Sequence, residues 1–285
     1  MFSVLKTFGR MVKFSHTVFA LPFALAATAL AARGHGITPA QVAAILVAMV
    51  GARTAAMGFN RIVDRRLDAK NPRTAGRELP TGKVSVVSAA LLTAISAAAF
   101  VVAAAILGRL CLALSPVVLG LVLGYSFTKR ITWLCHLFLG LAIGIAPAGA
   151  WIAVRGELAA PAIWMMAAVT TWIGGFDVLY ALSDCEFDRT AGVYSIPARF
   201  GIPAALVISA ALHLGTVVAL VAVGHSAGLG TIYFLGVAVV VAIFAYEHAI
   251  VRPSDLSRVD MAFFNLNGYV SLVYLLATLV QVFSG

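Results

Sequence analysis

The sequence predicts an all-α membrane protein with nine transmembrane helices. Of its 285 residues, 62% are hydrophobic and 11% are charged, whereas soluble domains carry roughly a quarter charged residues. Several apolar runs reach the ~20 residues that a helix needs to span a bilayer. The sequence lacks the alternation of apolar and polar residues that indicates a membrane β-barrel, so each span is expected to be a helix.

The expected spans follow one another without a polar linker. Residues 1–285 are therefore expected to form a single polytopic domain. The short segments between the apolar runs carry most of the charged residues, and these segments mark the ends of the helices. The spans are expected near residues 14–33, 38–60, 84–107, 111–128, 133–153, 161–183, 202–223, 229–250 and 261–283.

The basic residues predict the orientation in the membrane. The formal net charge is +9, and Arg53 lies in the interior of an expected span. With a cytoplasmic N-terminus, only Arg33, Arg109 and Arg155 would lie outside, as the positive-inside rule requires. The charge therefore does not indicate nucleic-acid binding. The lack of an Arg- and Ser-rich transit segment favours a bacterial or archaeal protein of the inner (cytoplasmic) membrane.

A first acidic motif lies where the second span ends. Asn60, Asp64 and Asp68 are spaced four residues apart, which places them on one face of a helix. Arg53 lies two turns earlier on the same face. Ionisable residues at membrane depth are costly and usually face a bundle interior or a hydrated cavity. A pocket role is therefore favoured for Arg53.

A second acidic motif ends the sixth span. Asp177, Tyr180, Asp184 and Asp188 follow at intervals of three, four and four residues, and a continuous helix would place them on one face. The orientation inferred from the basic residues puts both motifs on the cytoplasmic side. Two facing rows of carboxylates would repel each other unless cations lie between them.

Magnesium bound to a diphosphate is the simplest chemical interpretation of the two motifs. Mg²⁺ prefers oxygen ligands and is often held by one or two carboxylates together with substrate phosphates. The alternative is that the acids are interfacial charges paired with the many nearby arginines. The neutral side chain of Asn60 beside Asp64 favours the metal site.

Two basic segments could contact an anionic substrate. Arg73 and Arg77 lie in a loop rich in Gly, Thr and Pro after the second span. They suit phosphate oxygens, or lipid headgroups. Lys129 and Arg130 end the fourth span, where they could serve membrane topology alone, bind a diphosphate, or bind a carboxylate, which Arg contacts with two parallel hydrogen bonds.

Four ordered motifs resemble those of the UbiA-type intramembrane aromatic prenyltransferases, over nearly the whole chain. They are Asn60-x3-Asp64-x3-Asp68, the loop Arg73 to Gly82, the segment Tyr125 to Arg130, and Asp177-x2-Tyr180-x3-Asp184-x3-Asp188. The resemblance implies a nine-helix bundle around a central cavity. It also implies Mg²⁺ as cofactor, a polyprenyl diphosphate and an aromatic acid as substrates, a lipid-facing channel for the prenyl tail, and no obligate protein partner.

The resemblance also assigns roles to individual residues. The metal and diphosphate residues would be Asn60, Asp64, Asp184 and Asp188, with Asp68 in support. Arg53, Arg73, Arg77, Lys129 and Arg130 would contact the diphosphate or the aromatic acid, and Asp177 and Tyr180 would line the aromatic pocket. The residues expected to be catalytic are Asp64, Asp184, Asp177 and Arg53. Many members have Asn-Asp at the start of the first motif, whereas Arg61 follows Asn60 here, which leaves the ligand count open.

The aromatic acceptor and the class of protein leave alternatives. We expect 4-hydroxybenzoate, as in ubiquinone synthesis. The opening Lys13 to Ala24 and the late Met261 to Tyr269 also resemble a subgroup that prenylates a dihydroxynaphthoate in menaquinone synthesis by the futalosine route. A proton- or cation-coupled transporter is a further alternative, although such sites lie near the bilayer midplane. A CDP-alcohol phosphotransferase would need a D-G-x2-A-R opening that this sequence lacks.

Overall fold

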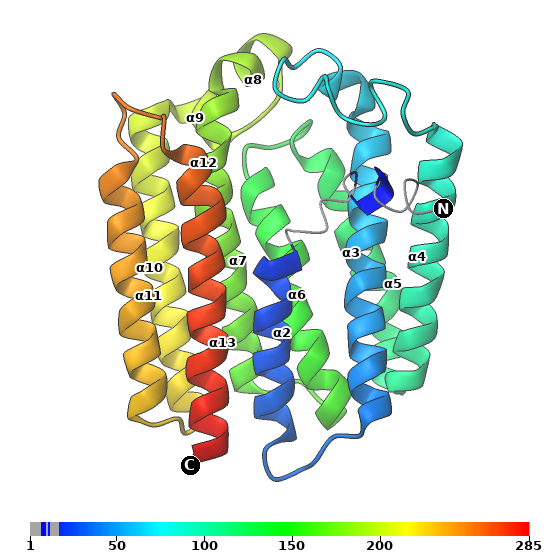
Figure 1. The fold of residues 1–285 in the computed structure, drawn as a ribbon, viewed down its shortest axis with the longest axis vertical. Coiled ribbons are helices and arrows are strands. Elements are labelled where there is room, and N and C mark those ends of the chain that lie inside the picture. Colours follow the sequence, from blue (N-terminus) through cyan, green and yellow to red (C-terminus); the bar gives the residue numbers. More distant parts are fainter. Residues whose placement is uncertain (1–6, 10, 12–16, 285) are drawn as a thin grey trace. The chain divides into compact units, whose positions relative to one another are not determined.

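The computed structural model describes residues 7–9, 11 and 17–284, and they are mostly helical (Figure 1). The long helices are α2 (Thr17–Ala32), α3 (Pro39–Asp68), α4 (Val86–Leu107), α5 (Arg109–Thr128), α6 (Cys135–Arg155), α7 (Ala160–Ala181), α10 (Ile202–Ser226), α11 (Thr231–Ile250) and α13 (Asn267–Ser284). The short ones are η2 (Leu182–Asp184), α8 (Cys185–Ala191), α9 (Ile196–Phe200), α12 (Val259–Met261) and the π-helical η3 (Ala262–Leu266). Within the described ranges, the only β pairing is an isolated bridge between Arg252 and Asp255.

The long helices correspond to the expected spans and confirm an all-α membrane protein. Eight helical segments of the described chain are long and apolar enough to cross a bilayer, and Ala20–Ala32 of α2 forms a shorter apolar helix. The start of the first expected span lies outside the described residues. The second span is longer than expected because α3 continues through the first acidic motif to Asp68.

The helices expose apolar side chains on their outer faces, as lipid contact requires. On α4 an exposed row comprises Val87, Leu91, Ile95, Val102 and Ile106. The polar side chains Thr93 and Ser96 of the same helix are buried. Contact between membrane helices depends on close packing and hydrogen bonds, because lipid tails are as apolar as the helices themselves.

The chain divides into two compact units. One comprises residues 1–17 and 38–127 and contains α3, α4 and α5; the other comprises residues 18–37 and 128–285 and contains α6 to α13 and nearly all of α2. In the first unit α3 approaches α4 closely at Gly51, where an added Cβ would lie 2.8 Å from the carbonyl oxygen of Ser96. In the second, α7 packs against both α6 and α10. The single domain expected from the sequence stays a prediction.

A buried polar network joins three helices of the second unit. The side chain of Asn267, at the start of α13, accepts a 2.6 Å hydrogen bond from Trp172 Nε1 of α7. Its amide nitrogen donates to Glu247 Oε1 of α11 at 2.9 Å and to the carbonyl of Ala262 at 3.0 Å. Asn267 and Glu247 are fully buried. The network therefore links α7, α11 and α13 through one side chain.

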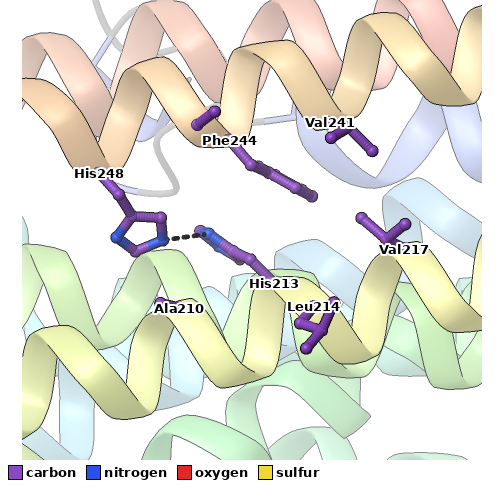
Figure 2. A pocket seen from close by; sticks show the side chains of 8 residues that line it. Ala210, His213, Leu214, Val217, Val241, Phe244 and His248 are labelled. Atoms are coloured by element: carbon purple, nitrogen blue, oxygen red, sulfur yellow. Dashed lines mark hydrogen bonds between the residues drawn. The ribbon is translucent and has the colours of Figure 1, made fainter.

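Two histidines extend this polar region toward a groove between α10 and α11. His213 Nδ1 and His248 Nε2 lie 3.0 Å apart (Figure 2). The groove that they line is otherwise apolar, and its walls include Leu214, Val217 and Phe244. The ring of Phe244 stacks on His213 with 4.2 Å between centroids. The pair is therefore a hydrogen-bonded contact between two helices, and the sequence separation of the histidines did not predict it.

The network predicts a large effect of Asn267→Ala on stability. The substitution removes the partner of Glu247 Oε1 and the acceptor of Trp172 Nε1, and each buried polar group left unpaired costs about 1–3 kcal/mol. We expect the detergent-solubilised protein to melt about 5 °C lower. The matched control is Asn265→Ala, two residues earlier, where the side chain is exposed. Equal melting temperatures for the two variants would contradict a structural role for the network.

Candidate active site

The first acidic motif lies at the C-terminal end of α3. Asp64 and Asp68 are 1% and 5% exposed, respectively. Asn60 Nδ2 donates to Asp64 Oδ2 at 3.0 Å and contacts Ser126 Oγ of α5 at 3.5 Å. The Asn60–Asp64 bond confirms that these two residues share a face of the helix. Carboxylates near a helix C-terminus oppose the helix dipole, so this placement does not serve the stability of α3.

The loop after α3 folds back onto Asp68. Arg77 Nη1 contacts both carboxylate oxygens of Asp68, at 2.7 Å and 2.8 Å, and Thr74 Oγ1 donates to the Asp68 carbonyl at 3.0 Å. Asn71 Oδ1 accepts from the backbone N–H of Arg73 at 2.9 Å, and the Arg73 side chain is exposed. The structure therefore pairs Arg77 with Asp68, while Arg73 lies at the surface of the loop.

Two other arginines lie along α3. Arg53 is half-buried two turns before Asn60. Arg61 replaces the acid that follows Asn60 in many family members, and its side chain is 4% exposed. Arg61 Nε donates to the carbonyl of Met11 at 3.1 Å. Arg61 thus has a structural role, because it links Met11 to α3.

The second acidic motif does not lie on one continuous α-helix, which its expected single face assumed. Asp177 and Tyr180 lie on α7, which ends at Ala181. Asp184 ends the 3₁₀ turn η2, and Asp188 lies on α8. A 3₁₀-helix turns by about 120° per residue and an α-helix by about 100°. Three 3₁₀ residues therefore rotate the residues that follow by roughly 60° relative to a regular α-helix. The turn therefore interrupts the regular spacing, and a shared face of the four residues stays a prediction.

The remaining basic candidates lie between α5 and α6. Lys129 is half-buried and Arg130 is exposed. The Lys129 carbonyl accepts a 2.8 Å hydrogen bond from the backbone N–H of Tyr194, which follows the second acidic motif. This bond holds the segment after α8 beside the segment that precedes α6, and so it brings Lys129 near the residues that follow Asp188.

His136 is a residue that the sequence analysis missed. It lies in the first turn of α6 and is 2% exposed. Its Nδ1 lies 2.7 Å from Asp177 Oδ2. A single histidine at the start of a span carries no motif, and its partner lies 41 residues away in the chain. The contact could be found only from the packing of α6 against α7.

The oxygen donors of the first motif fit a divalent cation that is shared with a substrate. The described residues contain no group of three or more His, Cys, Asp or Glu side chains that would hold a metal ion by themselves. Mg²⁺ does not require such a group, because it typically keeps water and takes phosphate oxygens as ligands beside one or two carboxylates. The pair Asn60 and Asp64, with one carboxylate and one amide, is a donor set of this kind.

Comparison with known proteins assigns the family. Residues 20–269 match the UbiA prenyltransferase family. The chain belongs to the UbiA prenyltransferase family. It is therefore a prenyltransferase, as the four motifs indicated. This UbiA enzyme also shares its architecture with a UbiA homologue from Aeropyrum pernix, with a TM-score of 0.84 at 35% identity over 93% of this chain and 98% of that one.

Two further proteins extend the comparison. A 4-hydroxybenzoate octaprenyltransferase from Vibrio cholerae is 32% identical to the UbiA enzyme over 231 residues, which cover 81% of this chain and 80% of the relative. A UbiA homologue from Archaeoglobus fulgidus, solved bound to DMAPP and Mg²⁺, has a TM-score of 0.65 and 20% identity, over 94% of this chain and 99% of that one. This last similarity demonstrates a shared fold.

The ion pair at the end of α3 predicts the effect of Arg77→Gln. The Asp68 carboxylate is 6% exposed, and the substitution leaves it without its cation. Removing one partner of a buried pair costs about 3–5 kcal/mol, and we expect about 2 kcal/mol here because Arg77 is partly exposed. The free energy of unfolding should be measured without substrate. Arg66→Gln, at an exposed position on α3, is the control, and equal stability of both variants would contradict the pairing.

Proposed function

We propose that this UbiA enzyme transfers a polyprenyl group from a polyprenyl diphosphate to 4-hydroxybenzoate. The observation that carries the proposal is the identity of about 32% to 4-hydroxybenzoate octaprenyltransferases over four-fifths of both chains. A reaction of this kind supplies a precursor for ubiquinone. The acidic motif at the end of α3 supports a diphosphate substrate, since carboxylates at a helix C-terminus oppose the helix dipole and favour a bound cation.

The proposal assigns the diphosphate and Mg²⁺ to the acidic motifs. Asn60 and Asp64 are proposed as ligands of the ion and the diphosphate, and the resemblance gives Asp184 and Asp188 the same role. Asp68 supports the site and keeps Arg77 in place through the ion pair described above. When bound, Mg²⁺ neutralises charge that develops on the leaving diphosphate. A homologue with the same fold is described as bound to DMAPP and Mg²⁺.

The basic residues would contact the anionic groups of both substrates. Lys129, Arg130, Arg73 and Arg53 are proposed to stabilise the diphosphate or the carboxylate of the aromatic acid, because charge on the leaving group increases as the bond to the prenyl carbon breaks. Apolar helices exclude water from the resulting allylic cation. The aromatic ring attacks this cation, and loss of the ring proton restores aromaticity.

Asp177 and Tyr180 are proposed to line the site for the aromatic acid. Both lie in the last turns of α7, ahead of the residues assigned to the diphosphate. The Asp177 side chain is 24% exposed while its partner His136 is buried. A partly exposed carboxylate beside a tyrosine suits an aromatic acid that carries a hydroxyl group.

The proposed location is the bacterial inner membrane. The relatives that share about 32% identity come from bacteria, and the positive-inside rule favours a cytoplasmic N-terminus with the acidic motifs on the cytoplasmic side. The substrates and the lipid bilayer are the proposed partners. Nucleic acid and an obligate protein partner are not part of the proposal.

The acceptor is tested by comparing two candidate aromatic acids in separate reactions. Purified protein is given a polyprenyl diphosphate, Mg²⁺ and either 4-hydroxybenzoate or 1,4-dihydroxy-6-naphthoate, and prenylated products are measured by mass spectrometry. We expect the product of 4-hydroxybenzoate to dominate in kcat/KM. A preference for the naphthoate would overturn the assigned acceptor and favour menaquinone synthesis. Failure to release diphosphate with any acceptor would favour a transport role.

The metal assignment is tested with Asp64→Asn and Asp184→Asn. Each variant removes one carboxylate charge and keeps the side-chain volume, and we expect turnover to fall at least about a hundredfold. Glu186→Gln is the matched control, because Glu186 lies between Asp184 and Asp188 and is exposed. Chelation by EDTA should abolish turnover, and added Mg²⁺ should restore it. Near-normal turnover of both Asp variants, in protein that melts like the wild type, would overturn the assignment.

A further inference from the structure

One buried imidazole connects three segments of the second unit. His136 of α6 contacts Asp177 of α7 through Nδ1, at 2.7 Å from Oδ2. Its other nitrogen, Nε2, accepts a 3.2 Å hydrogen bond from the backbone N–H of Ile196, the first residue of α9. Both ring nitrogens therefore have partners, and the ring itself is 2% exposed.

These two contacts determine the tautomer of His136. An imidazole nitrogen that accepts a hydrogen bond must carry a lone pair. Because Nε2 accepts from the amide of Ile196, the proton of the neutral ring is on Nδ1, which then donates to Asp177. Histidines that bind metals or belong to catalytic triads share this property. The hydrogen bond made by one ring nitrogen determines whether the other nitrogen carries the proton.

The same part of the chain is held by two further bonds. The backbone N–H of Tyr194 donates to the carbonyl of Lys129 at 2.8 Å, and Cys135 Sγ contacts the Tyr194 carbonyl at 3.3 Å. His136 completes this set of bonds between the start of α6 and the segment that precedes α9. The Ile196 N–H that donates to Nε2 is thus part of a defined backbone structure, which fixes the orientation of the ring.

We infer that His136 is a positioning residue for the aromatic acceptor. It orients the Asp177 carboxylate through Oδ2, so that the other oxygen, Oδ1, accepts a hydrogen bond from the ring hydroxyl of a phenolic acid. The inference rests on the proposed function and adds to it a specific group of the substrate. Hydrogen bonding of a phenol to a carboxylate increases electron density at the ring carbons beside the hydroxyl, where a prenyl cation would attack.

The orientation of Asp177 depends on His136 because the carboxylate is the exposed member of the pair. The Asp177 side chain is 24% exposed and the His136 side chain 3%. A partly exposed carboxylate without a fixed donor samples several rotamers. A bond to a buried ring, which is itself held by the Ile196 amide, restricts it to one. Preorganisation of this kind lowers the cost of ordering the site when the substrate binds.

Two substitutions at position 136 separate the two hydrogen bonds. In His136→Asn the shorter amide places an N–H near the position of Nδ1, so the bond to Asp177 is kept and the acceptor for Ile196 is lost. In His136→Gln the longer amide places an oxygen near Nε2, so the acceptor for Ile196 is kept and the bond to Asp177 is lost. The pair of variants therefore tests the contact with Asp177 apart from the contact with the backbone.

We expect His136→Gln to raise KM and Kd for 4-hydroxybenzoate by about tenfold or more, since a hydrogen bond to a charged group contributes about 1.5–3 kcal/mol. KM for the polyprenyl diphosphate should not change. His136→Asn should bind the acid as the wild type does. Asp177→Asn should have the same effect as His136→Gln, and the double variant should lose little more, because the two residues act through one contact.

Kd is measured by calorimetry without polyprenyl diphosphate, and melting temperatures are recorded for every variant. Wild-type affinity in His136→Gln would overturn the inference. So would an equal loss of affinity in His136→Asn and His136→Gln if both variants also melt at a lower temperature than the wild type. In either case the proposed function stands, provided the wild type prenylates the acid. A wild type that neither binds nor prenylates a phenolic acid would overturn both proposals.

Discussion

The structure depends on one constraint, which is that polar groups inside a membrane bundle must find partners within the protein. The chain has 11 acidic residues among 285, and an ionised carboxylate in an apolar interior is costly without a cation or hydrogen-bond donors. Each buried or half-buried acid is therefore informative. The described contacts reveal the partners of several of these acids. The partners distinguish acids that stabilise helix packing from acids that are assigned to the substrate.

Three acids have specific protein partners of different kinds. Asp68 is paired with the guanidinium of Arg77, Asp177 with the imidazole of His136, and Glu247 with the amide of Asn267. The Glu247 contact links helices and serves stability. The other two involve residues at the ends of α3 and α7, which the proposed function assigns to the substrates. Polar contacts thus join helices and also hold side chains at helix ends.

The change of helix type after α7 has a consequence for the chemistry. A continuous α-helix would present Asp177, Asp184 and Asp188 in one row. The 3₁₀ turn at Leu182–Asp184 separates Asp177 from the two acids that follow. The proposed function assigns Asp177 to the aromatic acid and the two later acids to the diphosphate, and the turn lies between these two assignments in the chain.

The sequence by itself determined the class of fold, the approximate ends of the helices and the identity of the acidic motifs. These follow from the free energy of transferring side chains into lipid and from the spacing of residues on a helix, which are local properties. Only the tertiary structure decided that α7 ends in a 3₁₀ turn, that Arg77 pairs with Asp68, and that His136 contacts both Asp177 and Ile196. Their partners are set by helix packing and loop closure, and these depend on contacts between residues far apart in the chain, which no local pattern records.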